Sequence, residues 1–415
     1  MILTKYKLRE ILDVTRGASL SGEYYATEGE YIRLTCGNFD YQNNCFKENK
    51  SKDNLYYVGD FKSEFLMEEG DIITPLTEQA IGLLGSTAII PESGKYIQSQ
   101  DVAKIICKED LLDKDFAFYL ISSALVKQQL SAAAQQTKIR HTSPDKIKDC
   151  TVWIPELSEQ KRIGKLLRSI DRKIELNRAI NQNLEAMAKQ LYDYWFVQFD
   201  FPNEEGKPYK SSGGEMVWNE KLKRKIPNEW DNCKLKDFIN LFDSKRIPLS
   251  SKDREERKGN YPYYGATGIM DYVNEYIFDG DYILLAEDGS TSDSKGFPIV
   301  QYIWGKNWVN NHAHIILPKN EQYLMFTYQM LRSIPAKQIE TGSIQKKISQ
   351  ENLCEYNMVL PNSILIEKYE SIISPLWEKR KLCIEEINAL IKQRDELLPL
   401  LMNGQASVNS DLSDG

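Results

Sequence analysis

The chain repeats itself over most of its length, and this repeat constrains the fold more than any single motif. The segment KIRHTSPDKIKDCTVWIPEL (138–157) resembles IQKKISQENLCEYNMVLPNS (344–363). An offset of 206 residues aligns basic residues of the two copies, Arg140 with Lys346 and His141 with Lys347. KLREILDVTRG (7–17) is similar to KLKDFINLFDSKR (234–246), and the Gly-Asp segments that begin at 70 and 280 also correspond. The repeat predicts two copies of one folding unit, as expected for a chain too long for one ordinary core.

A long helix is predicted at the end of each copy. Ser158 is the expected N-cap of the first helix, and Glu159 in its first turn suits the helix dipole. The residues from 158 to 201 contain no proline. Pro375 should kink or begin the second helix, because proline lacks the N–H and clashes with the carbonyl four residues earlier. Pro399 and Gly404 mark its end.

Apolar residues recur in steps of four and three along both predicted helices, which predicts that they form a mutual coiled coil. The first seam comprises Ile163, Leu167, Ile170, Ile174, Leu184, Ala188, Leu191 and Trp195. The second comprises Tyr369, Ile373, Leu376, Cys383, Ile387, Leu390, Leu397 and Leu401. Polar residues interrupt both seams at Asn177, Asn181, Arg380 and Arg394, and such residues are expected to fix the register. The alternative is two unconnected amphipathic helices, each covering its own domain.

The remainder of each copy contains short runs of β-branched and aromatic residues separated by turn signals, followed by a helical stretch. This pattern predicts an α+β fold with two sheet-containing recognition domains, separated by two long antiparallel coiled-coil helices in a pseudo-twofold arrangement. The predicted organisation is a first domain at 1–156, a long helix at 157–200, a linker at 201–230, a second domain at 231–362, a second long helix at 363–404 and a tail at 405–415. The linker is assigned from its Gly, Pro, Ser and charged residues.

No catalytic motif is evident. The sequence has no P-loop, no glycine-rich dinucleotide or adenosyl-cofactor turn, and no Asn-Pro-Pro-aromatic segment. His312 and His314 would share one face of a predicted strand, but without an evident third ligand a solvent- or DNA-facing pair is favoured over a metal site. Glu287 and Asp288 could serve as acid and base, although a turn after a strand explains them equally well.

Composition sets further limits. Hydrophobic residues make up 41% and charged residues 27% of the chain, as in ordinary globular proteins. The seven cysteines are scattered and form no C-x-x-C pair, which favours ordinary thiols in a reducing, cytoplasmic setting. No apolar run is long enough for a membrane span and the N-terminus lacks a secretory signal. The net charge of −7 is unusual for a DNA-binding protein, but screening within about 8–10 Å leaves room for a local basic cleft.

Residues 157–202, LSEQKRIGKLLRSIDRKIELNRAINQNLEAMAKQLYDYWFVQFDFP, closely resemble the central helical region of the specificity (S) subunits of Type I restriction–modification systems. YPYYGATGIMDYVNEYIFDGDYILLAEDGS and WVNNHAHIILP resemble the second recognition domain of that family, and RDELLPLLMNG resembles its closing helix. The resemblance implies two target-recognition domains, each reading one half of an asymmetric bipartite DNA site. The two helices would act as a ruler and as the docking surface for two modification (methylase) subunits.

The resemblance also implies that this chain catalyses nothing and binds no cofactor itself. S-adenosylmethionine would be bound by the modification subunits, which methylate adenine. ATP and Mg²⁺ would be used by restriction/translocase subunits, which join the complex and cleave DNA. The absent P-loop and methylase motifs are consistent with this division of labour.

Candidate DNA-contacting residues follow from the resemblance and from residue type. Basic, amide and hydroxyl side chains hold phosphates and read base edges, and Tyr263, Tyr264 and Gly265 are expected to form a compact loop that a ligand can approach closely. In the second domain the candidates are Tyr264, Gly265, Thr267, Gly268, Asp288, Gly289, Ser290, Asn310, Asn311, His312, Gln345, Lys346 and Lys347. In the first domain, whose loops differ in sequence, they are Gln79, Lys138, Arg140 and His141.

Two other functions remain open at this point. A nuclease with fused recognition domains is disfavoured because no acidic cluster or motor motif is evident. A coiled-coil scaffold or an acidic DNA mimic is disfavoured because the sheet-rich parts diverge while the helices stay alike. A nuclease assay and competition binding with duplex DNA would separate these possibilities.

Overall fold

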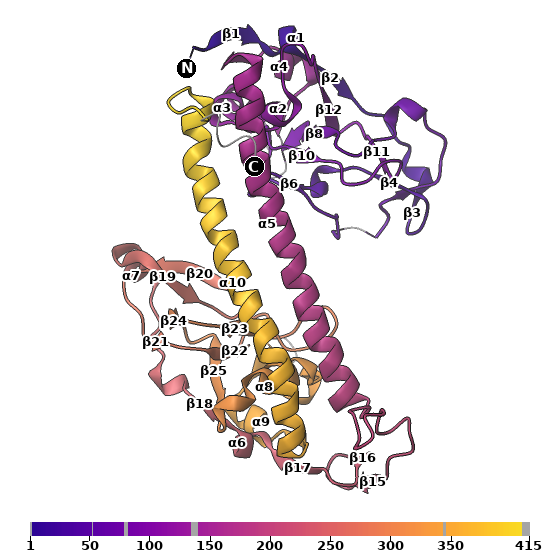
Figure 1. Ribbon diagram of the computed structural model, residues 1–415, viewed down its shortest axis with the longest axis vertical. Coiled ribbons are helices and arrows are strands. Elements are labelled where there is room, and N and C mark those ends of the chain that lie inside the picture. The colour runs from indigo at the N-terminus through magenta and orange to yellow at the C-terminus, as the bar shows by residue number, and fades with distance from the viewer. Residues whose placement is uncertain (1, 52, 79–81, 134–139, 343–345, 409–415) are drawn as a thin grey trace. The chain divides into compact units, whose positions relative to one another are not determined.

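The computed structural model describes residues 2–51, 53–78, 82–133, 140–342 and 346–408. The chain divides into two compact units, unit 1 (Met1–Asn177 and Glu385–Gly415) and unit 2 (Arg178–Ile384). The two long helices, α5 (Leu157–Tyr192) and α10 (Ser363–Met402), each contribute one part to unit 1 and the other part to unit 2. Figure 1 shows α5 in magenta and α10 in yellow. Among the described residues, no helix is both long and apolar enough for a membrane span.

Unit 1 is built on two four-stranded sheets. The main sheet has the order β10 (Ala88–Ile89), β8 (Ile72–Pro75), β12 (Val102–Cys107) and β2 (Leu12–Arg16), and its neighbouring strands are antiparallel. The second sheet has the order β11 (Tyr96–Ile97), β4 (Tyr31–Arg33), β7 (Tyr56–Tyr57) and β3 (Tyr25–Ala26). Short pairs complete the strands: β1 (Thr4–Lys7) with β14 (Thr151–Ile154), β5 (Phe39–Asp40) with β6 (Cys45–Phe46), and β9 (Thr77–Glu78) with β13 (Arg140–His141). The short helices are α1 (Leu8–Ile11), α2 (Lys114–Ile121), α3 (Ala124–Ala133) and α4 (Pro144–Lys148), with 3₁₀ turns at Gly22–Tyr24, Cys36–Asn38 and Ser63–Phe65.

Unit 2 repeats this plan. Its main antiparallel sheet has the order β18 (Ile239–Leu241), β25 (Ala313–Pro318), β22 (Tyr282–Ala286) and β23 (Val300–Ile303). Its second sheet has the order β20 (Ile269–Val273), β19 (Lys258–Tyr264), β24 (Lys306–Val309) and β21 (Phe278–Asp279). The short pairs are β17 (Asp231–Lys234) with β28 (Asn357–Leu360), β15 (Met216–Asn219) with β16 (Arg224–Pro227), and β26 (Glu340–Thr341) with β27 (Lys347–Ile348). The helices are α6 (Leu235–Phe238), α7 (Ser251–Glu256), α8 (Leu324–Ser333) and α9 (Gln350–Glu355), with 3₁₀ turns at Asp243–Lys245, Glu321–Tyr323 and Ala336–Gln338.

The strand orders confirm the repeat and the predicted α+β class. In each main sheet the strand that comes first in sequence, β2 or β18, lies at one edge, next to the strand that comes last in sequence, β12 or β25. The alignment of His141 with Lys347 also has a structural counterpart. His141 pairs with Thr77, just after β8, and Lys347 bridges to Asp288, just after β22. The basic segments of the two copies therefore occupy equivalent edges of equivalent sheets.

The two long helices pack antiparallel within each unit, as predicted. In unit 1, Ile170 and Ile174 of α5 are buried with Ile387 of α10. In unit 2, the Tyr369 hydroxyl donates a hydrogen bond to the carbonyl of Ala188 at 3.2 Å. Residue numbers rise along α5 while those of their partners fall along α10, so the predicted seams face each other rather than covering separate domains.

The structure corrects the predicted N-cap at Ser158 and excludes one of the two roles predicted for Pro375. Helix α5 begins at Leu157, so Ser158 lies inside its first turn and its hydroxyl donates to the Glu156 carboxylate at 2.7 Å instead of capping the helix. Helix α10 begins at Ser363 and continues through Pro375, so Pro375 does not begin it. Packing of the apolar face outweighs the loss of one backbone hydrogen bond there.

The segment predicted as a linker (201–230) is folded. It contains the β15–β16 hairpin, and the ring of Phe201 stacks between Tyr209 and Trp230 at centroid distances of 4.7 and 5.1 Å. Phe201 and Trp230 are buried in the core of unit 2. Composition misled the prediction because a few aromatic residues can fix a segment that is otherwise rich in Gly, Ser and charge.

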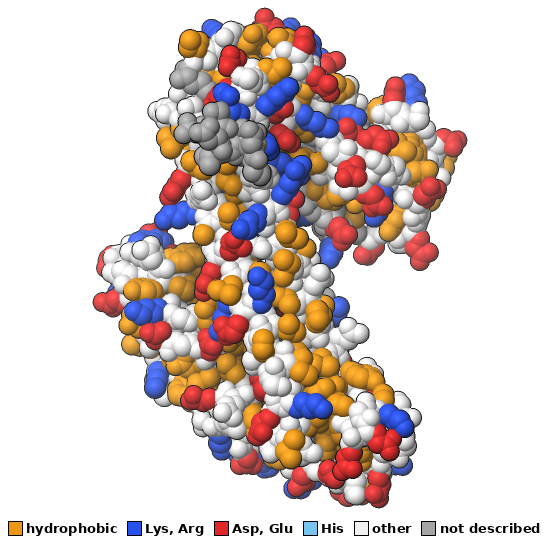
Figure 2. Space-filling view, in the orientation of Figure 1, with side chains coloured by type: hydrophobic (Ala, Val, Ile, Leu, Met, Phe, Trp, Pro, Cys, Tyr) orange, Lys and Arg blue, Asp and Glu red, His pale blue; other side chains and the backbone are white. Residues whose placement is uncertain are grey.

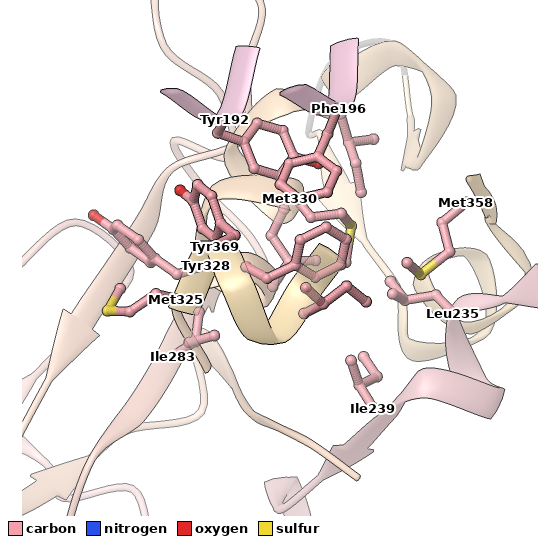
Figure 3. Close-up of a cluster of buried hydrophobic side chains, with 14 of the residues drawn as sticks. Tyr192, Phe196, Leu235, Ile239, Ile283, Met325, Tyr328, Met330, Met358 and Tyr369 are labelled. Atoms are coloured by element: carbon pink, nitrogen blue, oxygen red, sulfur yellow. The ribbon is translucent and has the colours of Figure 1, made fainter. Parts of the chain in front are cut away.

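An aromatic cluster joins the long helices to the rest of unit 2. After Tyr192, α5 continues as a π-helical turn, Asp193–Val197, which places the Phe196 ring 4.9 Å from Phe326 of α8 and 5.2 Å from Tyr369 of α10. Figure 3 shows Tyr192, Phe196 and Tyr369 lying together above the side chains of α8 and the sheet. The helix ends are therefore part of the core of unit 2.

Glu370 is a charged group inside this core. Its carboxylate accepts hydrogen bonds from the Phe326 backbone N–H at 2.7 Å and from the Ser374 hydroxyl at 3.1 Å, and its side chain is buried. Burial raises the pKa of Glu370 to about 7, although these hydrogen bonds oppose the rise. A carboxyl group with a raised pKa keeps its proton in the folded state at pH values where the unfolded chain has lost it.

We predict that unit 2 of the wild-type protein loses stability as pH rises from about 4.5 to about 7, by about 3 kcal/mol at most. Glu370→Gln removes the titration while keeping an acceptor for Phe326, so it should abolish this decline and stabilise the protein at pH 8. Urea unfolding at a series of pH values measures the effect. Glu367→Gln, one turn earlier at an exposed position, is the matched control, and equal pH profiles for both variants would contradict the prediction.

A second buried charge lies in unit 1. Asp171 of α5 accepts hydrogen bonds from Arg394 of α10 at 2.9 Å and from the Tyr119 hydroxyl of α2, and all three side chains are buried. Breaking a buried pair leaves an uncompensated charge, whereas replacing both partners by apolar residues is often tolerated.

We therefore predict that Asp171→Asn lowers the free energy of unfolding by about 3 kcal/mol. The double substitution Asp171→Leu/Arg394→Met should recover most of this loss. Asp395→Asn removes an exposed partner of the same arginine and should cost under about 1 kcal/mol. Urea unfolding checks all three, and equal losses for Asp171→Asn and Asp395→Asn would refute the importance of the buried pair.

Candidate nucleic-acid interface

The loops predicted to contact DNA in unit 2 meet at one end of its sheets. Asn310 follows β24, and its backbone N–H donates to the carbonyl of Tyr264, the last residue of β19, at 3.0 Å. The Asn310 side-chain oxygen accepts from the His312 N–H at 2.8 Å. Tyr263 and Tyr264 themselves belong to β19 and Tyr263 is buried, so the predicted compact loop begins only at Gly265.

These contacts continue to the segment that contains Lys346 and Lys347. The His312 ring lies 2.6 Å from the Asp288 carboxylate, measured from Nδ1 to Oδ1, and the Glu287 N–H donates to the His312 carbonyl at 2.8 Å. Asp288 in turn forms an isolated bridge with Lys347, whose ammonium lies 3.1 Å from the Glu287 carboxylate. Residues from four separate loops thus form one continuous surface.

These candidates differ in exposure, and Tyr264, Gly268 and Asp288 are half-buried. The exposed ones are Thr267, Gly289, Ser290, Asn311, His312, Lys346 and Lys347. Gly265 and Asn310 are buried, so they hold the loops rather than offer contacts. Gly289 has a φ of +75°, a conformation that favours glycine, whereas a Cβ on Gly265 would meet only the flexible end of the exposed Met270 side chain at less than 3.0 Å. Gln345 lies outside the described residues.

A buried ionic cluster lies directly beneath this surface. His314 of β25 is fully buried, with Nδ1 2.6 Å from Asp243 Oδ2 and Nε2 2.7 Å from the Ile348 carbonyl oxygen. The prediction that His312 and His314 share an exposed face is wrong. Strand β25 begins at Ala313, so strand alternation does not extend to His312.

Asp243, Glu287 and His314 have potential ligand atoms within 4.8 Å of one another, a spacing that one metal ion could bridge. Both carboxylates, however, already face cations. Arg246 lies 2.7 Å from Glu287 and 3.5 Å from Asp243, and Lys347 also pairs with Glu287. Burial raises the pKa of Asp243, but hydrogen bonds and the charge of His314 outweigh it and the pKa is lowered. The arrangement fits an ion-pair network better than a metal site or an acid–base pair.

Unit 1 presents a shorter version of the surface. His141 and Arg140 lie on β13, where the Arg140 guanidinium is 3.6 Å from the Glu78 carboxylate and donates to the Ser131 hydroxyl at 3.0 Å. The His141 Nδ1 is 3.3 Å from the Thr77 hydroxyl. Gln79 and Lys138 lie outside the described residues.

Comparison with known proteins decides what these two units belong to. The family model for the Type I restriction modification DNA specificity domain matches residues 3–186 and 227–386, most of the chain. The chain belongs to the Type I restriction–modification specificity (S) subunit family.

Individual relatives agree with this assignment. The MjaIX Type I restriction enzyme specificity subunit of Methanocaldococcus jannaschii is 23% identical over 330 residues, covering 75% of this chain and 73% of that protein. A putative Type I specificity subunit of Haemophilus influenzae is 34% identical over 142 residues, about a third of each chain (34% and 35%). The crystal structure of the Type I S subunit from M. genitalium covers 97% of this chain and 96% of its own with a TM-score of 0.62, and at 18% identity it supports the fold alone.

Apolar residues at this surface were missed by sequence reasoning. In this S subunit, Ile269, Met270 and Tyr272 of β20 are exposed, and the Met270 sulfur lies 3.3 Å from the Asn310 amide nitrogen. The run GIMDYV resembles an ordinary core strand, so the sequence gave no signal of exposure. Only the position of β20 at the edge of its sheet reveals it.

Three of the four polar residues in the helix seams have partners across the helix pair. Asn177 donates to the Glu386 carboxylate at 2.8 Å and Arg394 pairs with Asp171, both in unit 1. In unit 2, Arg380 lies 3.4 Å from Glu185. The buried Asn181 side-chain oxygen has no hydrogen-bond partner among the described residues. Their predicted role in fixing the register stays a prediction.

Proposed function

We propose that this S subunit reads an asymmetric bipartite DNA site, with one half-site read by each unit, and that it catalyses no reaction itself. The observation that carries the proposal is the repeated topology with unlike loops at equivalent sheet edges. Two copies with the same loops would favour a symmetric site, whereas unlike loops favour two different half-sites. Adenine methylation and restriction are then performed by partner subunits, which carry S-adenosylmethionine, ATP and Mg²⁺.

The exposed groups of unit 2 suit double-stranded DNA. Lysines pair with phosphates, while hydroxyl, amide and imidazole groups such as those of Ser290, Asn311 and His312 can read base edges in the major groove. The net charge of −7 limits how strongly this chain attracts DNA alone. Partner subunits would then supply part of the affinity, and tight, sequence-selective binding by the isolated chain would contradict this.

We assign docking of a modification subunit to an apolar groove in unit 2. The groove has a volume of about 770 Å³ and lies between α5 and α10, where its lining includes Met187, Tyr194, Ile372 and Leu376. Met187 and Ile372 are 53% and 41% exposed, and Figure 2 shows hydrophobic side chains gathered over this end of the helices. Exposed apolar patches of this kind are typical of protein–protein contacts. A second modification subunit and the restriction/translocase subunits complete the proposed complex.

Mapping of methylated adenines tests the function directly. Cells that express this chain with its cognate modification subunit should methylate an asymmetric two-part motif, and methylation should disappear when this chain is omitted. Absence of new methylation, with a complex shown to form, would favour a scaffold or a DNA mimic. Strand cleavage by the purified chain alone would favour the nuclease.

A salt titration tests the proposed phosphate contact. Lys346 is exposed, and a lysine that neutralises one phosphate contributes about 0.9 to the slope of log affinity against log salt concentration. We predict that Lys346→Gln weakens DNA binding by the assembled complex and lowers that slope by about one, without changing the motif. Lys319→Gln, exposed at the other end of β25, is the control. Equal slopes for both variants would refute the contact.

A further inference from the structure

The buried ring of His314 faces a hydrogen-bond acceptor on each side. Its Nδ1 lies 2.6 Å from the Asp243 carboxylate and its Nε2 lies 2.7 Å from the Ile348 carbonyl. A neutral imidazole has one N–H, whereas the imidazolium has two. The ring can therefore donate to both neighbours only when it carries both protons, and otherwise one acceptor faces a lone pair.

The ring joins three segments that are distant in sequence. Asp243 follows β18, His314 lies in the central strand β25, and Ile348 lies in β27 beside Lys347. The Ile348 N–H donates to the Glu287 carbonyl at 2.8 Å, so β27 is attached both to His314 and to the end of β22. The exposed residues His312 and Lys347 and the half-buried Asp288 each lie within two residues of one of these attachment points.

Acidic side chains lie next to the His314 ring, and basic side chains pair with them. Asp243 lies at Nδ1, and Glu287 approaches the same nitrogen at 3.7 Å. Arg246 pairs with both carboxylates and Lys347 pairs with Glu287. Gln350 donates a hydrogen bond to Asp243. Burial raises the pKa of the Cys354 thiol of α9, and the negative charge of Asp243 adds to this rise. Each carboxylate at the ring is thus paired with at least one cation.

We propose that His314 is a positioning residue for DNA recognition by unit 2. Without touching DNA, its ring holds β27 against the sheet, so that Lys347 stands in register with the loops that carry Asp288 and His312. This inference rests on the proposed function and concerns only the half-site that unit 2 reads. Each ring hydrogen bond contributes to that register, and losing one frees β27 to shift relative to the loops.

Unit 1 provides an internal control because it has alanine, Ala103, at the position equivalent to His314. His314 pairs with Leu285, one position from the end of the β22–β25 ladder, and the corresponding pair in unit 1 is Ala103 with Thr74. In unit 1, Arg140 of β13 instead forms an ion pair with Glu78. A change at His314 should therefore alter the reading of one half-site and leave the other unchanged within the same molecule.

The experiment uses the complex of the full chain with its modification subunit. Methylation rates are measured on duplexes with single base changes in either half of the mapped motif. For His314→Gln, whose two donor hydrogens lie on one nitrogen and whose other polar atom is an acceptor, we expect at least tenfold weaker discrimination in one half-site and wild-type discrimination in the other. Wild-type discrimination in both halves, or equal loss in both, would overturn the proposal.

A second variant, Asp243→Asn, tests the same idea if His314→Gln fails to fold, because it removes the charge of the carboxylate at Nδ1 and keeps the size of the side chain. Its discrimination should fall in the same half-site and remain at the wild-type level in the other. Equal discrimination in the two half-sites would overturn the proposal. If the wild-type complex methylates no bipartite motif, the proposed function falls as well, whereas a wild-type motif with unaffected variants defeats only the role of His314.

Discussion

The antiparallel contact between α5 and α10 is the constraint on which the rest of the structure depends. Each unit contains a part of both helices, so neither core is complete without a segment from the far end of the chain. In unit 1, Ile163 and Leu167 share a core with Leu401 and Met402, and in unit 2, Tyr192 shares one with Tyr369. An apolar seam alone would tolerate a shift of one heptad. We expect the pairs Asn177–Glu386, Asp171–Arg394 and Glu185–Arg380 to make such a shift costly, because it would separate the buried Asn177, Asp171 and Arg394 from their partners.

The two units share a topology but differ in their loops, and these two properties have different physical causes. The strands and short helices of each unit must cover one end of the helix pair, which limits the apolar pattern they can carry. The segments that include and follow the ends of β8 and β22 differ in sequence, with TPLTEQAIGLLG in unit 1 and LLAEDGSTSDSKG in unit 2. If each unit reads one half-site as proposed, a scaffold of this kind would let the bases read by one unit change without altering the helix contact.

Much of this architecture could be predicted from the sequence, and the errors have physical causes. The repeat and the heptad seams are periodic patterns, and their consequences were correctly predicted because periodicity survives divergence. Local rules failed where tertiary contacts outweigh them: Ser158 bonds to Glu156 instead of capping, and Phe201 and Trp230 order a segment with the composition of a linker. The candidate loops of unit 2 were named largely through a family resemblance, and their contacts bring them together. Which of them are buried, such as Asn310, could not be foreseen, because burial depends on partners elsewhere in the chain.

The ionic cluster around His314 shows why sequence spacing alone cannot assign a charged residue to a surface. His314 and Asp243 are 71 residues apart, and no sequence pattern in either segment predicts their contact. Desolvating a charge is costly unless partners and hydrogen bonds compensate, so a cluster of Asp243, Glu287, Arg246, His314 and Lys347 can exist only in one arrangement of the segments that carry them. An apolar core at this place would pack equally well with β27 displaced by a few tenths of an ångström. Reading base edges does not allow that freedom, since hydrogen bonds weaken steeply with distance and angle. A buried polar cluster beneath a polar reading surface is therefore a means of fixing geometry, at the expense of stability that a hydrophobic core would have provided.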